Sequence, residues 1–327
     1  MPSNEELNIL AILNRVFAIQ SSGRATRFAD PTNGSESYDG SSPAKAKLLA
    51  QSAITSAGKY GAVVLLPGTY AENLVVANSN VWIMGATYDG AQKAAVSPAS
   101  GVALDLQNGL CKVSDMYLSS GDDHVIKATG PKHEFSNLAI EVLHDDKIGI
   151  WLNDADYAKL SGLYLNGGNL DNVIGVLFGS GTVSGNLTDS TILNFGDPLG
   201  GGAHNGYGVA MHALSQRINV LRNFIASNAY GTYCYTTGGA ATWHAIHANE
   251  HYLNRLYDIY SPDAATDTGI RADGNFYAYT GWYEDVRHTG IAEKVVPCGD
   301  DATDPLLDWA PLTHPESWRY THGPRNR

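Results

Sequence analysis

Short apolar runs rich in β-branched and aromatic residues recur from Ala62 onward, separated by Gly, Asn and Asp. Clear examples are VVLL (63–66), VWIM (81–84), MYL (116–118), IGIWL (148–152) and VIGVLF (173–178). Each run is too short for a helix, and the polar breaks between the runs are typical of turns. The pattern therefore predicts a succession of short β-strands.

One repeated set of positions has Asp or Asn three residues before a glycine or its equivalent. The set runs through Asp146, Asn172, Asn205 and Asn228, with steps of 26, 33 and 23 residues. Asp123 lies 23 residues before Asp146 and extends the set. The long step contains a glycine-rich insertion, which we expect to form a loop on one face.

A second repeated set begins at Val113, Phe135 and Leu160, with steps of 22 and 25 residues. A unit of this length holds about three short strands and cannot bury its own apolar face, so successive units must stack. The sequence predicts an all-β solenoid in which equivalent residues lie one above another. We call one full turn of this solenoid a coil.

The N-terminal residues have a different pattern. Residues 5–20 place apolar side chains at helical spacing, residues 21–42 are typical of a linker, and residues 43–57 predict a second helix. We expect residues 1–42 to serve attachment, residues 43–295 to form the solenoid domain with 43–57 as its capping helix, and residues 296–327 to form an extended C-terminal arm or cap.

Composition and charge narrow the classes of function. The net charge of −12 argues against a nucleic-acid partner, and no apolar run is long enough to span a membrane. The acidic N-terminus does not resemble a signal peptide, and the three cysteines are widely spaced. We therefore expect synthesis in a reducing cytoplasm, without export and without a disulfide framework.

The segments GKYGAVVLLPGTYAENLVV (58–76) and VWIMGATY (81–88) resemble the opening of right-handed parallel β-helix proteins of the pectin-lyase-like superfold. The resemblance covers roughly residues 40–290. It implies about 8–10 coils, an N-terminal capping helix and extended terminal arms. This superfold includes polysaccharide lyases and hydrolases as well as bacteriophage tailspike, tail and capsid-attached proteins, so fold alone does not give the function. The Gly-His-Gly of polygalacturonase-like members is absent.

The first candidate site is a corner of acidic residues, formed by Asp122, Asp123, Asp145 and Asp146. Carboxylates on stacked coils would lie about 5 Å apart, which suits an acid/base pair for glycoside chemistry. The same oxygens could hold Ca²⁺, although we expect no other metal and no cofactor. A structural alternative is that these side chains cap backbone N–H groups at turns.

The second candidate site is for glycan binding. On a continuous strand, His247, Asn249 and His251 would share one face, with the aromatic side chains of Trp243 and Tyr235 near them. The alternatives are an exposed polar face or histidines bonded to neighbouring coils. Many further Tyr and Trp residues follow position 230, and subunit contacts explain this excess as well as sugar binding does.

From these observations the sequence favours a structural protein of a bacteriophage virion over an enzyme. In this hypothesis the protein is a homotrimer that decorates the capsid or tail, contacts other virion proteins through its N-terminal helix and C-terminal arm, and faces host glycans. The first alternative is a polysaccharide depolymerase that uses the acidic corner, testable with Asp146→Asn. The second alternative is a glycan-binding module without catalysis.

Overall fold

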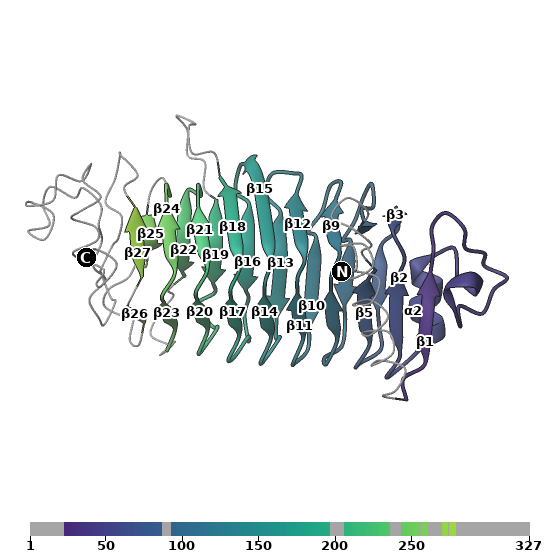
Figure 1. Ribbon diagram of the computed structural model, residues 1–327. Helices are drawn as coiled ribbons and strands as arrows, with labels where there is room; N and C mark the ends of the chain where they lie inside the picture. The colour runs from purple at the N-terminus through teal and green to yellow at the C-terminus, as the bar shows by residue number, and fades with distance from the viewer. Residues whose placement is uncertain are drawn as a thin grey trace, which may run out of the picture.

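The protein is a stack of coils, each built from three short strands joined by turns (Figure 1). The computed structural model describes residues 23–86, 93–196, 206–235, 243–254, 257–260, 270–273 and 275–278. Equivalent strands of successive coils pair in parallel and form three long sheets. The molecule is a right-handed parallel β-helix, so the predicted fold class is confirmed.

Three sheets run the length of the stack, and they are named here A, B and C. Within the described residues, sheet A contains ten strands: β1 (Thr26–Ala29), β2 (Ala62–Leu65), β5 (Trp82–Gly85), β8 (Lys112–Ser114), β11 (Glu134–Ser136), β14 (Lys159–Ser161), β17 (Asn186–Thr188), β20 (Asn219–Leu221), β23 (Ala245–His247) and β26 (Arg271–Asp273). Sheet B contains nine: β3 (Gly68–Tyr70), β6 (Ala94–Val96), β9 (Tyr117–Ser120), β12 (Ala139–Val142), β15 (Tyr164–Leu170), β18 (Thr191–Phe195), β21 (Phe224–Ala226), β24 (Glu250–Tyr252) and β27 (Phe276–Ala278). Sheet C contains eight: β4 (Leu74–Val76), β7 (Leu104–Leu106), β10 (Ile126–Thr129), β13 (Ile148–Asn153), β16 (Ile174–Phe178), β19 (Tyr207–Met211), β22 (Tyr230–Cys234) and β25 (Tyr257–Tyr260).

The strand register aligns the two repeated sets found in the sequence. In sheet A, Phe135 pairs with Val113 on one side and with Leu160 on the other. In sheet C, Asp146, Asn172 and Asn228 each lie two residues before strand positions that pair along the sheet. Asn205, the remaining member of this set, lies outside the described residues.

The core runs along the axis of the stack as one continuous apolar cluster. Because side chains alternate across a strand, every second residue points inward and meets its equivalents in the coils before and after it. The largest fully buried side chains include Phe135, Phe178, Phe195, Leu104, Leu118 and Ile126. Burial of this kind stabilises a fold by about 25 cal/mol per Å² of apolar surface.

One interior column changes character along the stack, at the turn that leads from sheet A to sheet B. We call it the inner turn column. Counting two residues beyond each sheet A strand, its buried members are Ala86, Met116, Leu138, Leu163, Ser190, Asn223, Asn249 and Asn275. The column is therefore apolar in the N-terminal coils and consists of amides in the C-terminal coils.

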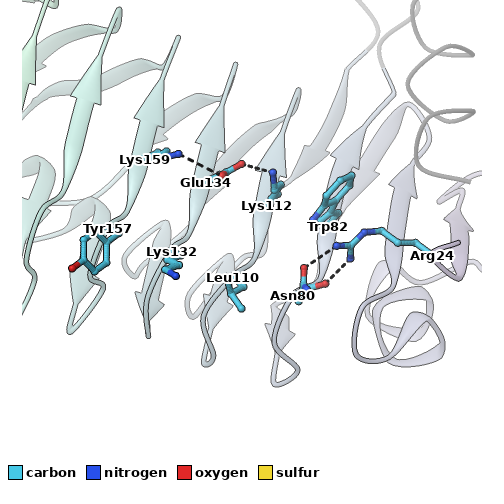
Figure 2. A pocket seen from close by; sticks show the side chains of 9 residues that line it. All are labelled: Arg24, Asn80, Trp82, Leu110, Lys112, Lys132, Glu134, Tyr157 and Lys159. Carbon is cyan, nitrogen blue, oxygen red and sulfur yellow. Dashed lines mark hydrogen bonds and ion pairs between the residues drawn. The ribbon is translucent and has the colours of Figure 1, made fainter. Parts of the chain in front are cut away.

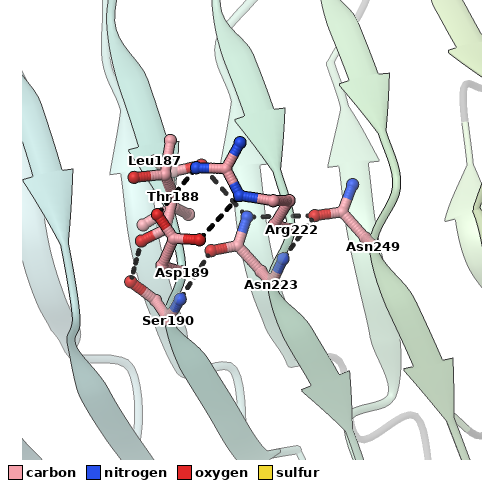
Figure 3. A network of polar contacts seen from close by, with 7 residues as sticks. All are labelled: Leu187, Thr188, Asp189, Ser190, Arg222, Asn223 and Asn249. Atoms are coloured by element: carbon pink, nitrogen blue, oxygen red, sulfur yellow. Dashed lines mark hydrogen bonds and ion pairs between the residues drawn. The ribbon is translucent and has the colours of Figure 1, made fainter.

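The amide part of this column forms a ladder of hydrogen bonds between coils (Figure 3). Asn223 Nδ2 donates to Leu187 O and to Asn249 Oδ1, both at 3.0 Å. Asn249 Nδ2 donates in the same way to Val220 O at 2.9 Å and to Asn275 Oδ1 at 3.0 Å. Each buried amide thus satisfies its own polar atoms and a backbone carbonyl of the coil before it.

The N-terminal end of the stack differs from the sequence-based prediction in two respects. Residues 23–42 were expected to be a linker, but they contain β1, the first strand of sheet A, whose burial shows that it belongs to the core. Residues 43–57 were expected to be one helix, but they form a short 3₁₀ turn, η1 (Pro43–Lys45), and a helix, α2 (Ala50–Ala57).

The physical reason for the interruption is pairing with β1. Lys47 N–H donates to Phe28 O, and Asp30 N–H donates to Lys47 O, so the chain between η1 and α2 is extended beside that strand. Helix α2 then buries Ala50, Ala53, Ile54 and Ala57 against β1, β2 and β4. The Glu72 carboxylate accepts the first helical N–H groups, from Ala50 at 2.7 Å and Gln51 at 3.0 Å.

The predicted helix over 5–20 and the predicted arm over 296–327 lie outside the described residues, so both stay predictions. None of the described helices is long and apolar enough to cross a membrane.

Candidate functional site

A group of aromatic and charged side chains lies on the outer face of sheet C, in its N-terminal half. Lys127 of β10 pairs with Trp151 of β13, and Asp105 of β7 pairs with Lys127. Paired residues of neighbouring parallel strands lie about 4.8 Å apart and share a face. These three residues alternate with buried neighbours, so their side chains point outward.

The half-buried indole of Trp151 is the centre of this group. Lys127 Nζ lies 5.4 Å from the indole centroid, within the range of a cation–π interaction. The His124 imidazole meets the indole edge-on, with ring centroids 5.2 Å apart and an interplanar angle of 84°. We call Asp123, His124, Lys127, Lys147 and Trp151 the His124 cluster.

The protonation of His124 follows from its contacts. Its Nδ1 accepts the Ile148 N–H at 3.1 Å, which fixes the neutral ring as the tautomer with its proton on Nε2. Burial lowers the pKa of His124, and the positive charges of Lys147 and Lys127 lower this pKa further, while Asp123 opposes the shift. The site therefore holds a neutral imidazole beside two ammonium groups and one carboxylate.

This arrangement has three chemical capacities. An indole offers an apolar face on which a sugar ring stacks, and the two ammonium groups attract a carboxylated ligand. The imidazole can transfer a proton through Nε2. A titratable group with a shifted pKa and defined charge neighbours is a physical indication of a functional site.

The acidic corner predicted from the sequence holds turns together. Asp122 Oδ1 accepts the Gly101 N–H of the coil before it at 2.7 Å, and Asp145 Oδ1 accepts the Asp171 N–H of the coil after it at 2.8 Å. Asp123 Oδ1 accepts the neighbouring His124 N–H at 2.7 Å. These contacts match the structural alternative, in which carboxylates cap backbone N–H groups.

The register also corrects the expected pairing of these acids. Counting back from the pair Ile126–Ile150 places Asp122 opposite Asp146, and Asp123 lies one residue further along. Asp146 is exposed and adopts a left-handed backbone with φ of 60°. Among the described residues, no group of three or more His, Cys, Asp or Glu side chains could hold a metal ion.

The expected shared face of His247, Asn249 and His251 is wrong. Ala248 has a positive φ of 51°, which turns the chain and places the three residues in different environments. His247 ends β23 of sheet A, Asn249 is a buried member of the inner turn column, and His251 is completely buried in β24. Asn249 and His251 are therefore not available to a glycan in the folded protein.

The other two residues predicted for glycan binding lie on separate elements. Trp243 is 63% exposed in the turn before β23, and Tyr235 follows β22 of sheet C. Tyr235 belongs to an aromatic cluster with ring centroids 4.5–5.9 Å apart, formed by Tyr207, Tyr230, Tyr233, Tyr235 and Tyr260. Burial raises the pKa of Tyr233 to about 12, so its hydroxyl stays protonated at neutral pH.

The sequence-based prediction missed His124, Lys127 and Trp151 as a group. The available signal was a tryptophan inside the run IGIWL, at a position that alternates with buried residues. Recognising the group also required the register between β10 and β13, because 24 positions separate Lys127 from its strand partner.

The fold is shared with several enzymes of known structure. An alginate lyase from Paenibacillus sp. is similar with a TM-score of 0.53 and 15% identity, over 72% of this chain and 95% of that chain. A rhamnogalacturonan lyase gives 0.57 and 12%, over 79% and 75%. A pectin methylesterase from Erwinia chrysanthemi gives 0.51 and 12%, over 81% and 92%.

At these identities the similarity concerns the fold alone. No model of a known protein family matches the sequence, and no curated protein is significantly similar to it.

Proposed function

We propose that this protein is a polysaccharide depolymerase whose substrate lies along the outer face of sheet C, across the His124 cluster. The observation that carries the proposal is the half-buried Trp151 indole, with an imidazole at its edge and an ammonium group 5.4 Å from its centroid. An aromatic platform with a few placed polar groups is the usual composition of a small-molecule or sugar site.

The charges of the cluster favour an acidic polysaccharide as the substrate. Lys127 and Lys147 both act electrostatically on His124, so both lie close to the position that a sugar on Trp151 would occupy. Two ammonium groups in a chain with a net charge of −12 would attract carboxylates at this point of the surface. Structural neighbours named for alginate, rhamnogalacturonan and pectin give this assignment additional support.

The imidazole supplies the proton transfer that cleavage requires. With Nδ1 engaged by the Ile148 N–H, the neutral ring presents an Nε2–H that can be donated to a departing glycosidic oxygen. Positioned acid–base groups of this kind contribute roughly 10²–10⁴-fold to a rate.

The virion role expected from the sequence has less support than this alternative. The structural neighbours with TM-scores above 0.5 that carry an enzyme name are lyases and an esterase. The homotrimer, the contacts with other virion proteins and the location in a virion stay predictions.

The test is an assay of the purified chain with alginate, polygalacturonate and rhamnogalacturonan. Reducing ends report cleavage, and ultraviolet absorbance of unsaturated ends separates a lyase from a hydrolase. His124→Asn, whose side-chain oxygen can still accept the Ile148 N–H, is expected to lower kcat at least about 100-fold. Trp151→Ala is expected to raise KM because it removes the stacking face.

Two controls make the result specific. Tyr164→Ala removes a 48% exposed aromatic side chain on the outer face of sheet B and should leave both constants unchanged. Asp146→Asn should also retain activity, in contrast to the expectation from the acidic corner. Binding without product release would reduce the proposal to a glycan-binding module, and unchanged activity of His124→Asn would contradict it.

A further inference from the structure

A second surface rich in cations and aromatic side chains lies on the outer face of sheet A, away from the His124 cluster. It is an open groove of about 340 Å³ that crosses β5, β8, β11 and β14 (Figure 2). Two parallel rows of side chains line it, one from the strands and one from the turns that precede them.

The strand row consists of Trp82, Lys112, Glu134 and Lys159, which are consecutive partners in the sheet. Lys112 Nζ lies 2.6 Å from the Glu134 carboxylate, while Lys159 Nζ lies 4.0 Å from it. With Arg24 and Lys132, the groove contains four cationic side chains and one carboxylate. It is therefore a positive surface on a chain whose net charge is −12.

Trp82 closes the N-terminal end of the groove between two cations. The Arg24 guanidinium lies 4.1 Å from the indole centroid and Lys112 Nζ lies 4.9 Å from it. Arg24 is held in place because its Nη1 and Nη2 donate to Asn80 O and Asn80 Oδ1, both at 2.9 Å. The guanidinium is thus positioned before any ligand arrives, which reduces the entropic cost of binding.

The turn row has an unusual choice of residues. Leu110, Lys132 and Tyr157 each lie two positions before a sheet A strand and adopt left-handed backbones, with φ of 67°, 62° and 58°. This conformation costs roughly 1–2 kcal/mol for a residue other than Gly, Asn or Asp. Leu110 and Tyr157 are nevertheless 44% and 53% exposed, so core packing does not explain why large side chains are present there.

We propose that this groove is a second binding site for an acidic polysaccharide, separate from the site of cleavage. The carboxylates of the polymer would lie against Lys112, Lys132 and Lys159, and Tyr157 and Leu110 would offer apolar faces to its sugar rings. The cations recur on coils about 4.8 Å apart, so a chain running parallel to the axis of the stack meets them in succession.

This assignment rests on the proposed function only for the identity of the polymer. A groove that is open along its length fits an extended chain, whereas a compact partner would contact a wider surface than these two rows. The substrate proposed for sheet C is itself acidic, and a second attachment point on the same molecule raises avidity without any new chemistry.

The test uses the double variant Lys132→Asn/Tyr157→Asn. Asparagine is tolerated at positive φ, so these substitutions remove the cation and the aromatic ring without adding backbone strain. Arg217→Asn is the matched control, because Arg217 is an exposed cation with φ of 55° at the equivalent position of a coil outside the groove.

Affinity for sodium alginate and polygalacturonate is measured in a background that also carries Trp151→Ala, so that binding reports the groove and not the proposed cleavage site. We expect the double variant to lose at least tenfold in affinity and part of its salt dependence, and Arg217→Asn to lose neither. Cleavage of short oligosaccharides by the groove variant with Trp151 intact should be unchanged.

The following results would overturn the inference. Equal affinity of the double variant and its background for both polymers would exclude the groove as their site. Equal binding of a single-stranded DNA oligonucleotide would mean that the groove senses charge only. A change of oligomeric state in the double variant would assign the groove to a second copy of the chain. Absence of all cleavage together with retained groove binding would sink the depolymerase proposal alone.

Discussion

The N-terminal and C-terminal coils solve the same packing problem with different chemistry. In the N-terminal coils the inner turn column is filled by Met116, Leu138 and Leu163, each only 1–2% exposed. In the C-terminal coils the same column contains Asn223 and Asn249, and neighbouring interior positions contain His251 and Asp258. Apolar contacts contribute more free energy per side chain, but they have no direction.

The amides add what the apolar side chains lack, which is a fixed vertical alignment. Each ladder asparagine bonds to the coil on both sides, so displacement by one residue would break several hydrogen bonds at once. Ser190 stands at the change between the two regimes, where its Oγ accepts the Leu163 N–H at 3.1 Å. The difference teaches that stability and register are supplied by different parts of one column.

Acid should separate the two halves most strongly. Burial lowers the pKa of His244 and of His251 to about 3, whereas an unfolded imidazole titrates near ~6.5. The unfolded chain therefore binds protons that the native C-terminal coils do not, and the free energy of unfolding falls as the pH drops through this window. The expected loss is on the order of a few kcal/mol per imidazole.

Hydrogen exchange at about pH 7.5 and about pH 4.5, corrected for intrinsic rates, measures this effect, with β20 and β23 losing protection before β13 and β14. His133 occupies the N-terminal coils and burial lowers its pKa as well, so a smaller loss is expected there. His244→Gln, which does not titrate, should reduce the acid sensitivity of β20 and β23. Unchanged acid sensitivity in this variant would contradict the assignment.

Truncation of the apolar column should have the next largest effect. Leu163→Ala is expected to lower the free energy of unfolding by about 3 kcal/mol, because it leaves a cavity between Leu138 and Ser190. Denaturant unfolding gives the value, and Leu163→Met, which conserves volume, should cost less than about 1.5 kcal/mol. A loss equal for both variants would mean that packing at this position is loose.

Truncation of the amide column should cost less in stability. Asn249→Ala leaves Val220 O and the Asn223 amide without one of their partners, and the expected loss is about 2 kcal/mol. Asn153→Ala, on the outer face of sheet C, serves as the control and should change stability by less than about 0.5 kcal/mol. A larger loss for Asn249→Ala than for Leu163→Ala would reverse the comparison between the two regimes.

The smallest effect is expected at the N-terminal end. Glu72→Gln removes the charge that caps the first N–H groups of α2 and should cost about 1 kcal/mol. Thermal unfolding measures the shift, and Glu250→Gln, an exposed carboxylate of β24, should leave the melting temperature unchanged. An equal shift for both variants would show that the loss is unrelated to the helix.

The repeated architecture could be predicted because its signal is carried by residue type. Positions such as Val113, Phe135 and Leu160 recur at one spacing, since each must fill the same interior position on a new coil. The linker prediction for residues 23–42 failed because β1 is only four residues long and its partner strand begins 36 positions later.

The candidate site was less accessible to sequence reasoning. The face assigned to His247, Asn249 and His251 assumed a continuous strand, and alanine gives no warning that position 248 adopts a positive φ. The turn row of the sheet A groove has the same difficulty, because Leu110 and Tyr157 are residue types that seldom adopt this conformation. Trp151 was visible, but its neighbours come from another coil.

The pairing of Gly40 and Lys47 with β1 has a consequence for how molecules of this protein meet. A parallel sheet that ended at β1 would present a row of free N–H and C=O groups, which invites another chain to continue it into a fibril. Here Phe28 N–H and Asp30 N–H are already bonded to Gly40 O and Lys47 O, and α2 lies over the adjoining core. Growth of the stack from this end is thereby blocked, and the rod has a defined beginning.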